Sequence, residues 1–286
     1  MSAFLSYLVS GIAVGCGFAL IGSGLVIIHR VTHVVNLSQG MYAVVAALSA
    51  ATFLAAGLPH GVAELCAVLV AVVAGLLTGL VAIGRRGTTP LSSLIITFAV
   101  GIFAYAVEVL TWGDQPRSFP GLPGAIEIAN VRVQEQYLLV VVASAAIFLA
   151  LDLFFERAYL GKALSACSSN PYAARVVGID VTRMGLFAFA LGGALGGLAG
   201  VLLGPLRPTS FDSDVSLVIE GFAAAILGGL TRPILALMGG LLLGVAEAMV
   251  AGYVNGSYQT DVALVLMLAV MIGQTARRPS LDAEGQ

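Results

Sequence analysis

Polar side chains gather in one short stretch of an otherwise apolar chain, at positions 29–42. The stretch reads HRVTHVVNLSQGMY and lies between two hydrophobic segments. Asn36, Ser38 and Gln39, followed by Gly40, could give hydrogen bonds to a polar solute on a transport path, or they could cap the start of a helix. The sequence leaves both alternatives open, and either one requires a transmembrane frame around the stretch.

Metal chemistry is not expected in this stretch. His29 and His33 are four residues apart and would share one face of a helix. A stable zinc site needs three or four ligands, and no third ligand stands at a suitable spacing. We therefore place both histidines and Arg30 at the membrane interface, and we expect no metal and no other cofactor.

Two glutamates lie deepest in the hydrophobic segments, Glu220 and Glu247. Ionisable groups at membrane depth are costly and usually line a cavity or find a partner. Glu247 shares a helix face with Gly240 and Gly244, so it should face protein rather than lipid. A place on the substrate path and a structural hydrogen bond to a neighbouring backbone both remain open for the two glutamates. Three other acids lie near the outer ends of hydrophobic segments, where water should reach them: Glu64, Glu108 and Asp261.

The composition is that of a membrane protein. The chain has 286 residues, of which 59% are hydrophobic and only 10% charged, and its mean hydropathy is +1.02. The net charge of −2 and the scattered basic residues do not suggest a nucleic-acid surface. We expect an all-α polytopic transmembrane bundle.

Hydrophobic windows predict eight or nine transmembrane spans, depending on whether the short seventh segment crosses. Basic residues cluster after the third, fifth and last segments, and the positive-inside rule assigns these clusters to the cytoplasm. Nine spans satisfy this rule, with the N-terminus outside and the C-terminus in the cytoplasm. The predicted spans are 4–28, 34–57, 62–84, 91–112, 137–155, 184–204, 217–230, 234–251 and 258–275.

The connections between spans are short, with two exceptions, so residues 1–286 form one transmembrane domain. Segment 113–136 mixes proline, glycine and charge, and it should be an external loop. Segment 156–183 carries Asn170-Pro171 and Gly178 and should be a cytoplasmic connection that can form two short helices.

Small residues recur every four positions in several spans. Gly192, Gly196, Gly200 and Gly204 do so in the sixth, and pairs such as Gly240 and Gly244 repeat the spacing. This spacing lets helix backbones approach closely in lipid, so tight helix crossings are expected. Four spans on each side of the fifth also suggest an inverted repeat, with 35–48 corresponding to 215–227.

Motifs for chemistry on a nucleotide or a peptide are missing. The Gly161-Lys162 pair is followed by Ala163 and lacks the upstream glycine of a P-loop. The sequence has no H-E-x-x-H and no G-x-S-x-G motif. We therefore expect a transport subunit rather than an enzyme, with ATP hydrolysis, if it drives transport, carried by separate proteins.

Three blocks resemble the permeases of branched-chain amino-acid ABC importers, the LivH/LivM group. The first is GFALIGSGLVIIHRVTHVVNLSQGMYAVVAAL, which keeps the pattern of Phe18-Ala19-Leu20, Gly24-Leu25 and Val35-Asn36 followed by Gly40. The second, SACSSNPYAARVVGID at 165–180, is similar to a cytoplasmic segment of that family. The third joins EGFAAAILGGL to GGLLLGVAEAM. Together the blocks cover most of the chain in the family's order.

Two departures from the family pattern concern the solute. Leu37-Ser38-Gln39 replaces the usual Phe-Ala-His, and Glu220 stands where lysine is common. If these positions help define the path, the solute differs from leucine, isoleucine or valine. The resemblance implies a small amino acid, an amide or a carboxylate.

The resemblance also implies partners: a second homologous permease, two cytoplasmic ABC ATPase subunits and an extracytoplasmic solute-binding protein. Segment 156–183 would then dock the ATPase, through Asn170, Pro171, Ala174, Arg175 and Gly178. For Asn170-Pro171, ordinary helix capping is the simpler alternative. A self-contained secondary transporter or channel is the alternative function, favoured by the inverted repeat and the buried glutamates.

Overall fold

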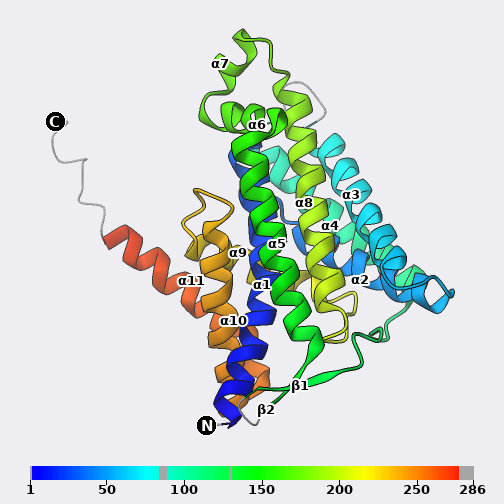
Figure 1. Cartoon of the computed structure of the whole chain (residues 1–286). Helices are drawn as coiled ribbons and strands as arrows, with labels where there is room; N and C mark the ends of the chain where they lie inside the picture. The colour runs from blue at the N-terminus through cyan, green and yellow to red at the C-terminus, as the bar shows by residue number, and fades with distance from the viewer. Residues whose placement is uncertain (1, 84–88, 129–130, 277–286) are drawn as a thin grey trace.

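The computed structural model describes residues 2–83, 89–128 and 131–276 and has the predicted polytopic helical bundle (Figure 1). Within these residues, nine helices stand at the nine predicted hydrophobic segments. The chain is a multi-pass membrane protein, because seven of them are long and apolar enough to cross a bilayer. The nine are α1 (Ser2–Thr32), α2 (Gln39–Ala55), α3 (Val62–Ile83), α4 (Pro90–Trp112), α5 (Glu135–Arg157), α8 (Val181–Leu203), α9 (Ser213–Leu227), α10 (Leu235–Tyr253) and α11 (Gln259–Ala276).

Helices α2 and α9 are the two short ones, with 17 and 15 residues. At 1.5 Å per residue, α9 is about 22 Å long, less than the roughly 30 Å of bilayer hydrocarbon. The shortness of the seventh segment was expected. For α2 the predicted start was wrong: residues 34–38 are apolar enough to join the span, but their backbone is not helical.

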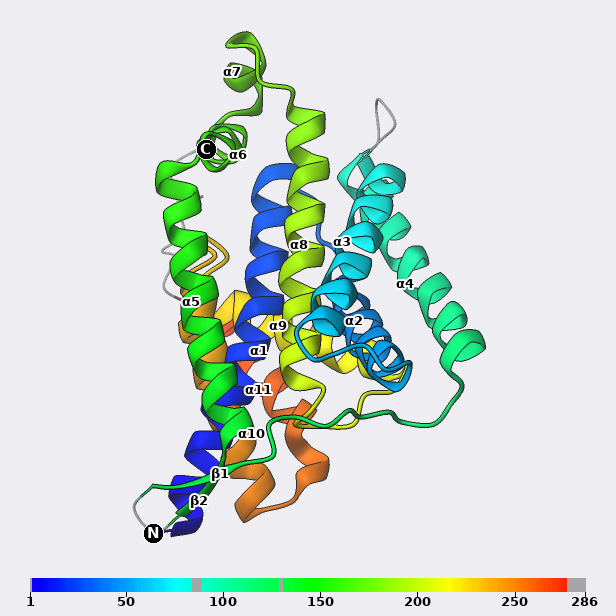
Figure 2. The same ribbon diagram turned by 45° about the vertical axis from the view of Figure 1, so that its right-hand side comes forward.

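The long helices run in two opposite directions between the two ends of the molecule (Figures 1 and 2). Helices α1, α3, α5 and α11 run toward the end that carries α6 (Tyr159–Ser169) and α7 (Pro171–Val176), while α4, α8 and α10 run away from it. We call this end the α6–α7 end. Helix α1 is the central helix and is almost wholly buried.

The helix packing has the internal symmetry expected of an inverted repeat. Helices α1–α4 precede α5, and α8–α11 follow it; α1 corresponds to α8 and α3 to α10. Helix α1 packs extensively along α10, and α3 packs in the same way along α8. The two short helices, α2 and α9, hold equivalent places in the two halves and touch each other.

Glycines make these crossings tight, as their spacing predicts. A β-carbon on Gly11 of α1 would lie 2.8 Å from the carbonyl oxygen of Gly244 on α10. In the α3–α8 crossing, a β-carbon on Gly193 would overlap the carbonyl of Ala71. Backbone contact of this kind replaces the hydrophobic driving force that lipid does not provide.

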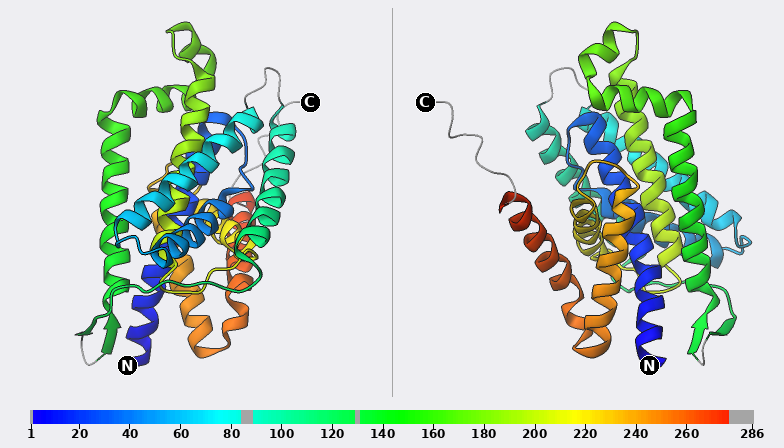
Figure 3. Two further views of the ribbon diagram at one scale, coloured as in Figure 1. Left: turned by 90° about the vertical axis from the view of Figure 1, so that its right-hand side faces the viewer. Right: turned by 60° about the vertical axis from the view of Figure 1, so that its left-hand side comes forward.

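The two long connections lie at opposite ends (Figure 3). Segment 156–183 forms two short helices, α6 and α7, as predicted. Segment 113–136 is not only a loop: β1 (Ala125–Ile128) pairs antiparallel with β2 (Val131–Gln134). Alternating Ile126, Ile128, Val131 and Val133 favour such strands. A 3₁₀ turn at Gly256–Tyr258 connects α10 to α11. The basic pairs Arg85/Arg86 and Arg277/Arg278 lie outside the described residues.

Candidate functional site

The chain is not helical between α1 and α2, in the middle of the polar stretch. His33 takes a left-handed conformation with φ 56°, while its N–H still bonds to the His29 carbonyl at 2.8 Å. The Thr32 hydroxyl accepts from the Val34 N–H at 3.2 Å. These bonds close the end of α1 and turn the chain back toward the bundle.

Asn36 organises the non-helical stretch. Its Oδ1 accepts hydrogen bonds from the Ser38 N–H at 3.2 Å and the Ser38 hydroxyl at 3.0 Å. Its Nδ2 donates to Gln39 Oε1 at 3.1 Å. All three side chains are buried. Asn36 therefore supplies the backbone bond that the missing helical turn would have made.

The same residues tie α2 to two other helices. The Ser38 hydroxyl shares its single proton between Asn36 Oδ1 and the Thr97 carbonyl of α4, which is 2.9 Å away, and Gln39 Nε2 donates to the Gly192 carbonyl of α8 at 2.9 Å. Ser38 is the N-cap residue of α2, but its side chain makes no capping bond. Ser38 therefore does not cap α2 with its side chain. Ser38 and Gln39 instead hold the start of α2 against α4 and α8.

The N-terminal turns of α2 and α9 meet inside the bundle. Gly40 packs against the backbone of Asp214, in contact with its carbonyl. Each helix N-terminus carries the positive end of its dipole. The crossing thus places two positive dipole ends close together, at the contact between the two repeats.

A second polar cluster lies on the other repeat and contains both predicted glutamates. Arg207, in the connection before α9, donates to Glu220 Oε2 at 3.1 Å. Its guanidinium also lies 5.4 Å from the ring centroid of Phe18 on α1. Glu247 of α10 is buried, and its Oε1 has no hydrogen-bond partner. Glu220 thus has a structural partner, but it is the Arg207 side chain and not the neighbouring backbone that was expected, and this oxygen of Glu247 has none.

Arg207 is a functional candidate that the sequence reasoning missed. It follows α8 in a proline-containing connection, which gives no helical periodicity to mark its depth. It could have been found from Glu220, because a glutamate buried at membrane depth is costly unless a cation lies nearby.

The expected position of Glu108 was wrong. The sequence places it near the outer end of α4, within reach of water, but its side chain is 1% exposed and neither carboxylate oxygen has a partner. It lies on an inward stripe of α4 with Thr97 and Ser93, which are also buried. The other face of α4 carries exposed apolar side chains, so the stripe turns Glu108 into the protein.

The residues predicted for coupling are brought together in α7 and its ends. Asn170 caps the helix through a bond from the Ala173 N–H to its Oδ1 at 3.0 Å, and Pro171 is the first helical residue. Asn170 and Pro171 therefore make the helix cap that the sequence suggested, and their role in coupling stays a prediction. Ala174 is buried and Arg175 is exposed. Gly178 ends the turn with φ 89°, a conformation that glycine adopts without strain.

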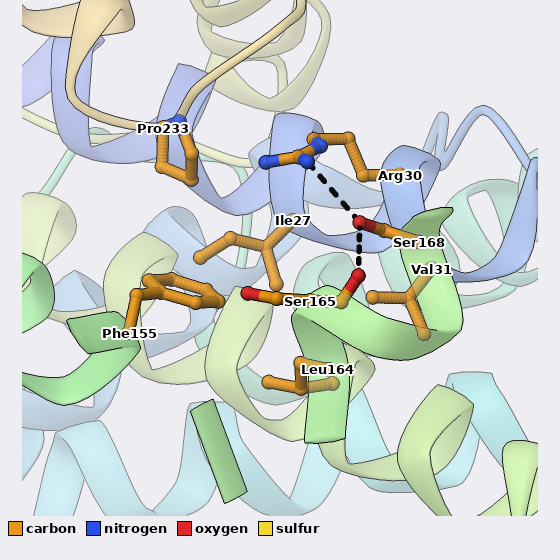
Figure 4. Close-up of a pocket in the computed structure, with 8 residues that line it drawn as sticks. All are labelled: Ile27, Arg30, Val31, Phe155, Leu164, Ser165, Ser168 and Pro233. Carbon is orange, nitrogen blue, oxygen red and sulfur yellow. Dashed lines mark hydrogen bonds between the residues drawn. The ribbon is translucent and has the colours of Figure 1, made fainter. Parts of the chain in front are cut away.

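A small pocket joins this element to the central helix (Figure 4). Arg30 of α1 donates to the hydroxyl of Ser168 on α6 at 3.1 Å, and Ser168 donates to the Ser165 carbonyl at 3.0 Å. The pocket is lined by Phe155 and Pro233 as well. The contact connects α6 to the last turn of α1, directly before the non-helical stretch. In the part of the chain that the structure describes, no three His, Cys, Asp or Glu side chains are placed to hold a metal ion.

Known proteins with similar sequences are transport permeases. The chain is 25% identical to the high-affinity branched-chain amino acid permease LivH of Salmonella typhimurium, over 94% of this chain and 93% of that protein. It is 29% identical to the corresponding permease BraD of Pseudomonas aeruginosa, with the same coverage.

The fold is also that of a solved structure. One chain of PsaBC from Streptococcus pneumoniae, solved in complex with Fab, matches with a TM-score of 0.56 at 13% identity, covering 95% of this chain and 91% of that one. The profile of the family described as "branched-chain amino acid transport system / permease component" matches residues 7–274. The chain therefore belongs to this family of ABC-transporter permease components.

Proposed function

We propose that this chain is the permease subunit of an ABC importer in a bacterial inner membrane. It works with a second homologous permease, two cytoplasmic ABC ATPases and an extracytoplasmic solute-binding protein. Its solute is a small amino acid, amide or carboxylate. In this arrangement the N-terminus and segment 113–136 face the outside, while segment 156–183 faces the cytoplasm.

The observation that carries the proposal is the shape of the α6–α7 element. It projects beyond the long helices at one end of the molecule (Figures 1 and 3). Its apolar side chains are uncovered, with Tyr172 77% and Val176 72% exposed. Arg175 and Lys162 are exposed beside them. A mixed apolar and basic projection of this kind suits a docking contact with another protein.

The path is proposed to run beside the α2–α9 crossing. Asn36, Ser38, Gln39 and Gly40 hold the start of α2, while Glu220 and Glu247 supply charge on the second repeat. Discontinuous helices at a repeat interface are typical of solute sites in transporters, because their dipole ends and freed backbone groups can face a solute.

Copurification and uptake test the proposal. The tagged chain should bring down ATPase subunits, and uptake into vesicles should stop when nucleotide hydrolysis is blocked. The double variant Tyr172→Ala, Val176→Ser should lose bound ATPase while keeping normal membrane insertion. Leu110→Ala, at an even more exposed apolar position on α4, serves as the control and should keep the bound ATPase.

Uptake by the purified chain alone, driven by an ion gradient, would instead establish a secondary transporter. A binding screen on the partner binding protein would identify the solute.

A further inference from the structure

A segment at one end of the bundle joins elements of both repeats. Residues 113–124, which we call the strap, leave the last turn of α4 and cross the end opposite α6 and α7, where they pass the connection after α8 and lead into β1 (Figure 2). Just before the strap, the Trp112 indole N–H donates to the Thr52 hydroxyl of α2 at 2.8 Å. Near its end, the Leu122 N–H donates to Gln136 Oε1 of α5 at 3.2 Å. Both ends of the strap are therefore held by helices.

The middle of the strap is paired with the connection between α8 and α9. Arg117 and Thr209 form an antiparallel bridge: the Arg117 N–H donates to the Thr209 carbonyl at 2.9 Å, and the Thr209 N–H donates to the Arg117 carbonyl at 2.8 Å. Thr209 follows Arg207 by two residues. The bridge therefore attaches the strap to the connection that holds the arginine partner of Glu220.

Phe119 is the point at which the strap enters the bundle. Its side chain is 7% exposed, whereas its neighbours Ser118 and Pro120 are exposed. The ring lies on Gly204, where a β-carbon would overlap it. It belongs to the same buried cluster as Tyr42 of α2. The strap thus inserts an aromatic side chain into the core.

This insertion continues the row of contacts along the glycine face of α8. Gly200 receives the backbone of Ala43 of α2. Gly204, four residues later and on the same face of the helix, receives the Phe119 ring. Phe119 therefore takes the place of a helix residue at the end of the α2–α8 contact and covers the core on that side.

The rest of the strap has the features of a segment that opens locally. Residues 114–118 are exposed, and Gly113 before them has φ 82° with no neighbour in reach of a β-carbon. Glycine tolerates large changes of backbone angle at such a position. Segments with few buried apolar contacts open at a low free-energy cost while the core stays folded. Lifting the strap about Gly113 requires loss of the Arg117–Thr209 bridge and withdrawal of the Phe119 ring.

We propose that the strap is a gate. It is closed in this structure by the Phe119 ring and the Arg117–Thr209 bridge, and it opens to let a solute reach the buried start of α2. The inference deepens the proposed function and rests on it in two respects: this end of the molecule is the outer one, and the chain transports a solute.

A disulfide in place of the bridge tests the gate. Residues opposite each other in a hydrogen-bonded antiparallel pair have Cα atoms about 5.5 Å apart, which lies within the range of disulfides. The double variant Arg117→Cys, Thr209→Cys, made together with Cys66→Ser, should form this bond on oxidation. Uptake by the complex in vesicles should then be lost, and it should return on reduction. Assembly and basal ATP hydrolysis should stay normal.

The single variants Arg117→Cys and Thr209→Cys, each with Cys66→Ser, are the matched controls, and oxidation should leave their uptake unchanged. They also account for the bond from the Arg117 guanidinium to the Trp112 carbonyl, which Arg117→Cys removes. The inference is overturned if the disulfide does not form, because the bridge is then absent. It is also overturned if the cross-linked complex transports as fast as the reduced one.

Thiol labelling of the purified full-length chain measures the opening without transport. In the Cys66→Ser background, Thr209→Cys replaces a buried side chain at the bridge, and the native Cys16 of α1 is the matched internal control, because it is also buried. Phe119→Ala should speed the labelling of Thr209→Cys several-fold and leave Cys16 protected. Equal acceleration at both thiols, or none at Thr209→Cys, would show that the strap does not open on its own.

The two measurements separate the gate from the proposed function. Labelling of Thr209→Cys that depends on Phe119, in a chain without nucleotide-driven uptake, contradicts only the proposed function. Nucleotide-driven uptake that the disulfide does not block contradicts only the gate.

Discussion

The carbonyl of Asp214 packs directly against Gly40, so the first turns of α9 and α2 touch backbone to backbone. One residue comes from each half of the inverted repeat. No side chain separates the two helix starts, and the dipole ends of both point into the same region. One polar cluster, around Asn36, lies at the start of α2, and the other, around Arg207, includes Glu220 of α9.

Gly40→Ala should therefore damage the fold. The added β-carbon would overlap the Asp214 carbonyl, and backbone cannot rotate away as a side chain can. Overpacking of a tight contact costs about 1–3 kcal/mol and sometimes more. Thermal unfolding of the purified chain should give a clearly lower Tm. Gly273→Ala is the matched control, because a β-carbon there meets no neighbour. An unchanged Tm for Gly40→Ala would show that the two helix starts are further apart than described.

The glycines of α8 should behave in the same way. A β-carbon on Gly200 would overlap the backbone of Ala43, and one on Gly196 would lie 2.9 Å from Tyr42 Cβ. Replacing either glycine by leucine should separate α8 from α2 and reduce the yield of assembled complex, measured by size-exclusion chromatography. Normal yield with both changes would contradict the role of close packing at this crossing.

The Arg207–Glu220 pair should be more sensitive to loss of the cation than to loss of both charges. Arg207→Ala leaves Glu220 buried and uncompensated. Breaking a fully buried pair costs about 3–5 kcal/mol, and the loss here should be smaller because the Arg207 side chain is 33% exposed. Glu220→Gln removes the buried charge and should cost less. The double variant should recover part of the stability that Arg207→Ala loses, as measured by Tm. If the double variant is as unstable as the sum of the single ones, the two residues do not form a pair.

Much of the frame could be predicted from the sequence, because hydrophobic length and glycine spacing act locally. Seven segments of about 20 mainly apolar residues each have the length and composition of helices that cross a membrane. The glycine repeat on α8 and the capping of α7 by Asn170 follow from near-neighbour chemistry in the same way.

The site depends on contacts between distant residues, which the sequence does not reveal. Val34 and Val35 are apolar and continue the hydrophobic window, yet α2 begins only at Gln39, because Asn36 bonds to Ser38 and holds the backbone out of the helix. Glu108 stands near a helix end in the sequence, but its burial depends on which elements pack against that face of α4. The β1–β2 pairing in segment 113–136 was not predicted, because the proline and glycine residues of that segment indicate a loop.

Topology can be tested with two exposed positions at opposite ends. In a background with Cys66 replaced by serine, Ser169→Cys on α6 should react with a membrane-impermeant thiol reagent only from the inside. Gln115→Cys, in segment 113–136, should react only from the outside. The remaining cysteines, Cys16 and Cys167, are buried and should stay unlabelled. Outside labelling of Ser169→Cys would reverse the proposed orientation.

Asn36 and Gln39 test whether the polar stretch serves the path or only the structure. Each Asn36 bond removed by Asn36→Ala leaves a buried partner on Ser38 or Gln39 unsatisfied, at about 1–3 kcal/mol per group. Gln39→Ala likewise leaves the Gly192 carbonyl without its donor. Some loss of stability is thus expected under either role.

The two roles differ in how uptake and stability change together. If the stretch lies on the path, Asn36→Ala and Gln39→Ala should reduce uptake by more than the loss of assembled complex, while basal ATP hydrolysis per complex stays normal. If the stretch is only structural, uptake and assembly should fall in proportion, and Asn36→Asp should restore both in part, because Asp keeps an acceptor for the Ser38 N–H. Because the amide groups of Asn36 and Gln39 are already satisfied by protein partners, a path role requires the Asn36 to Gln39 bonds to open when solute passes. Unchanged uptake per complex in the double alanine variant would exclude the stretch from the path.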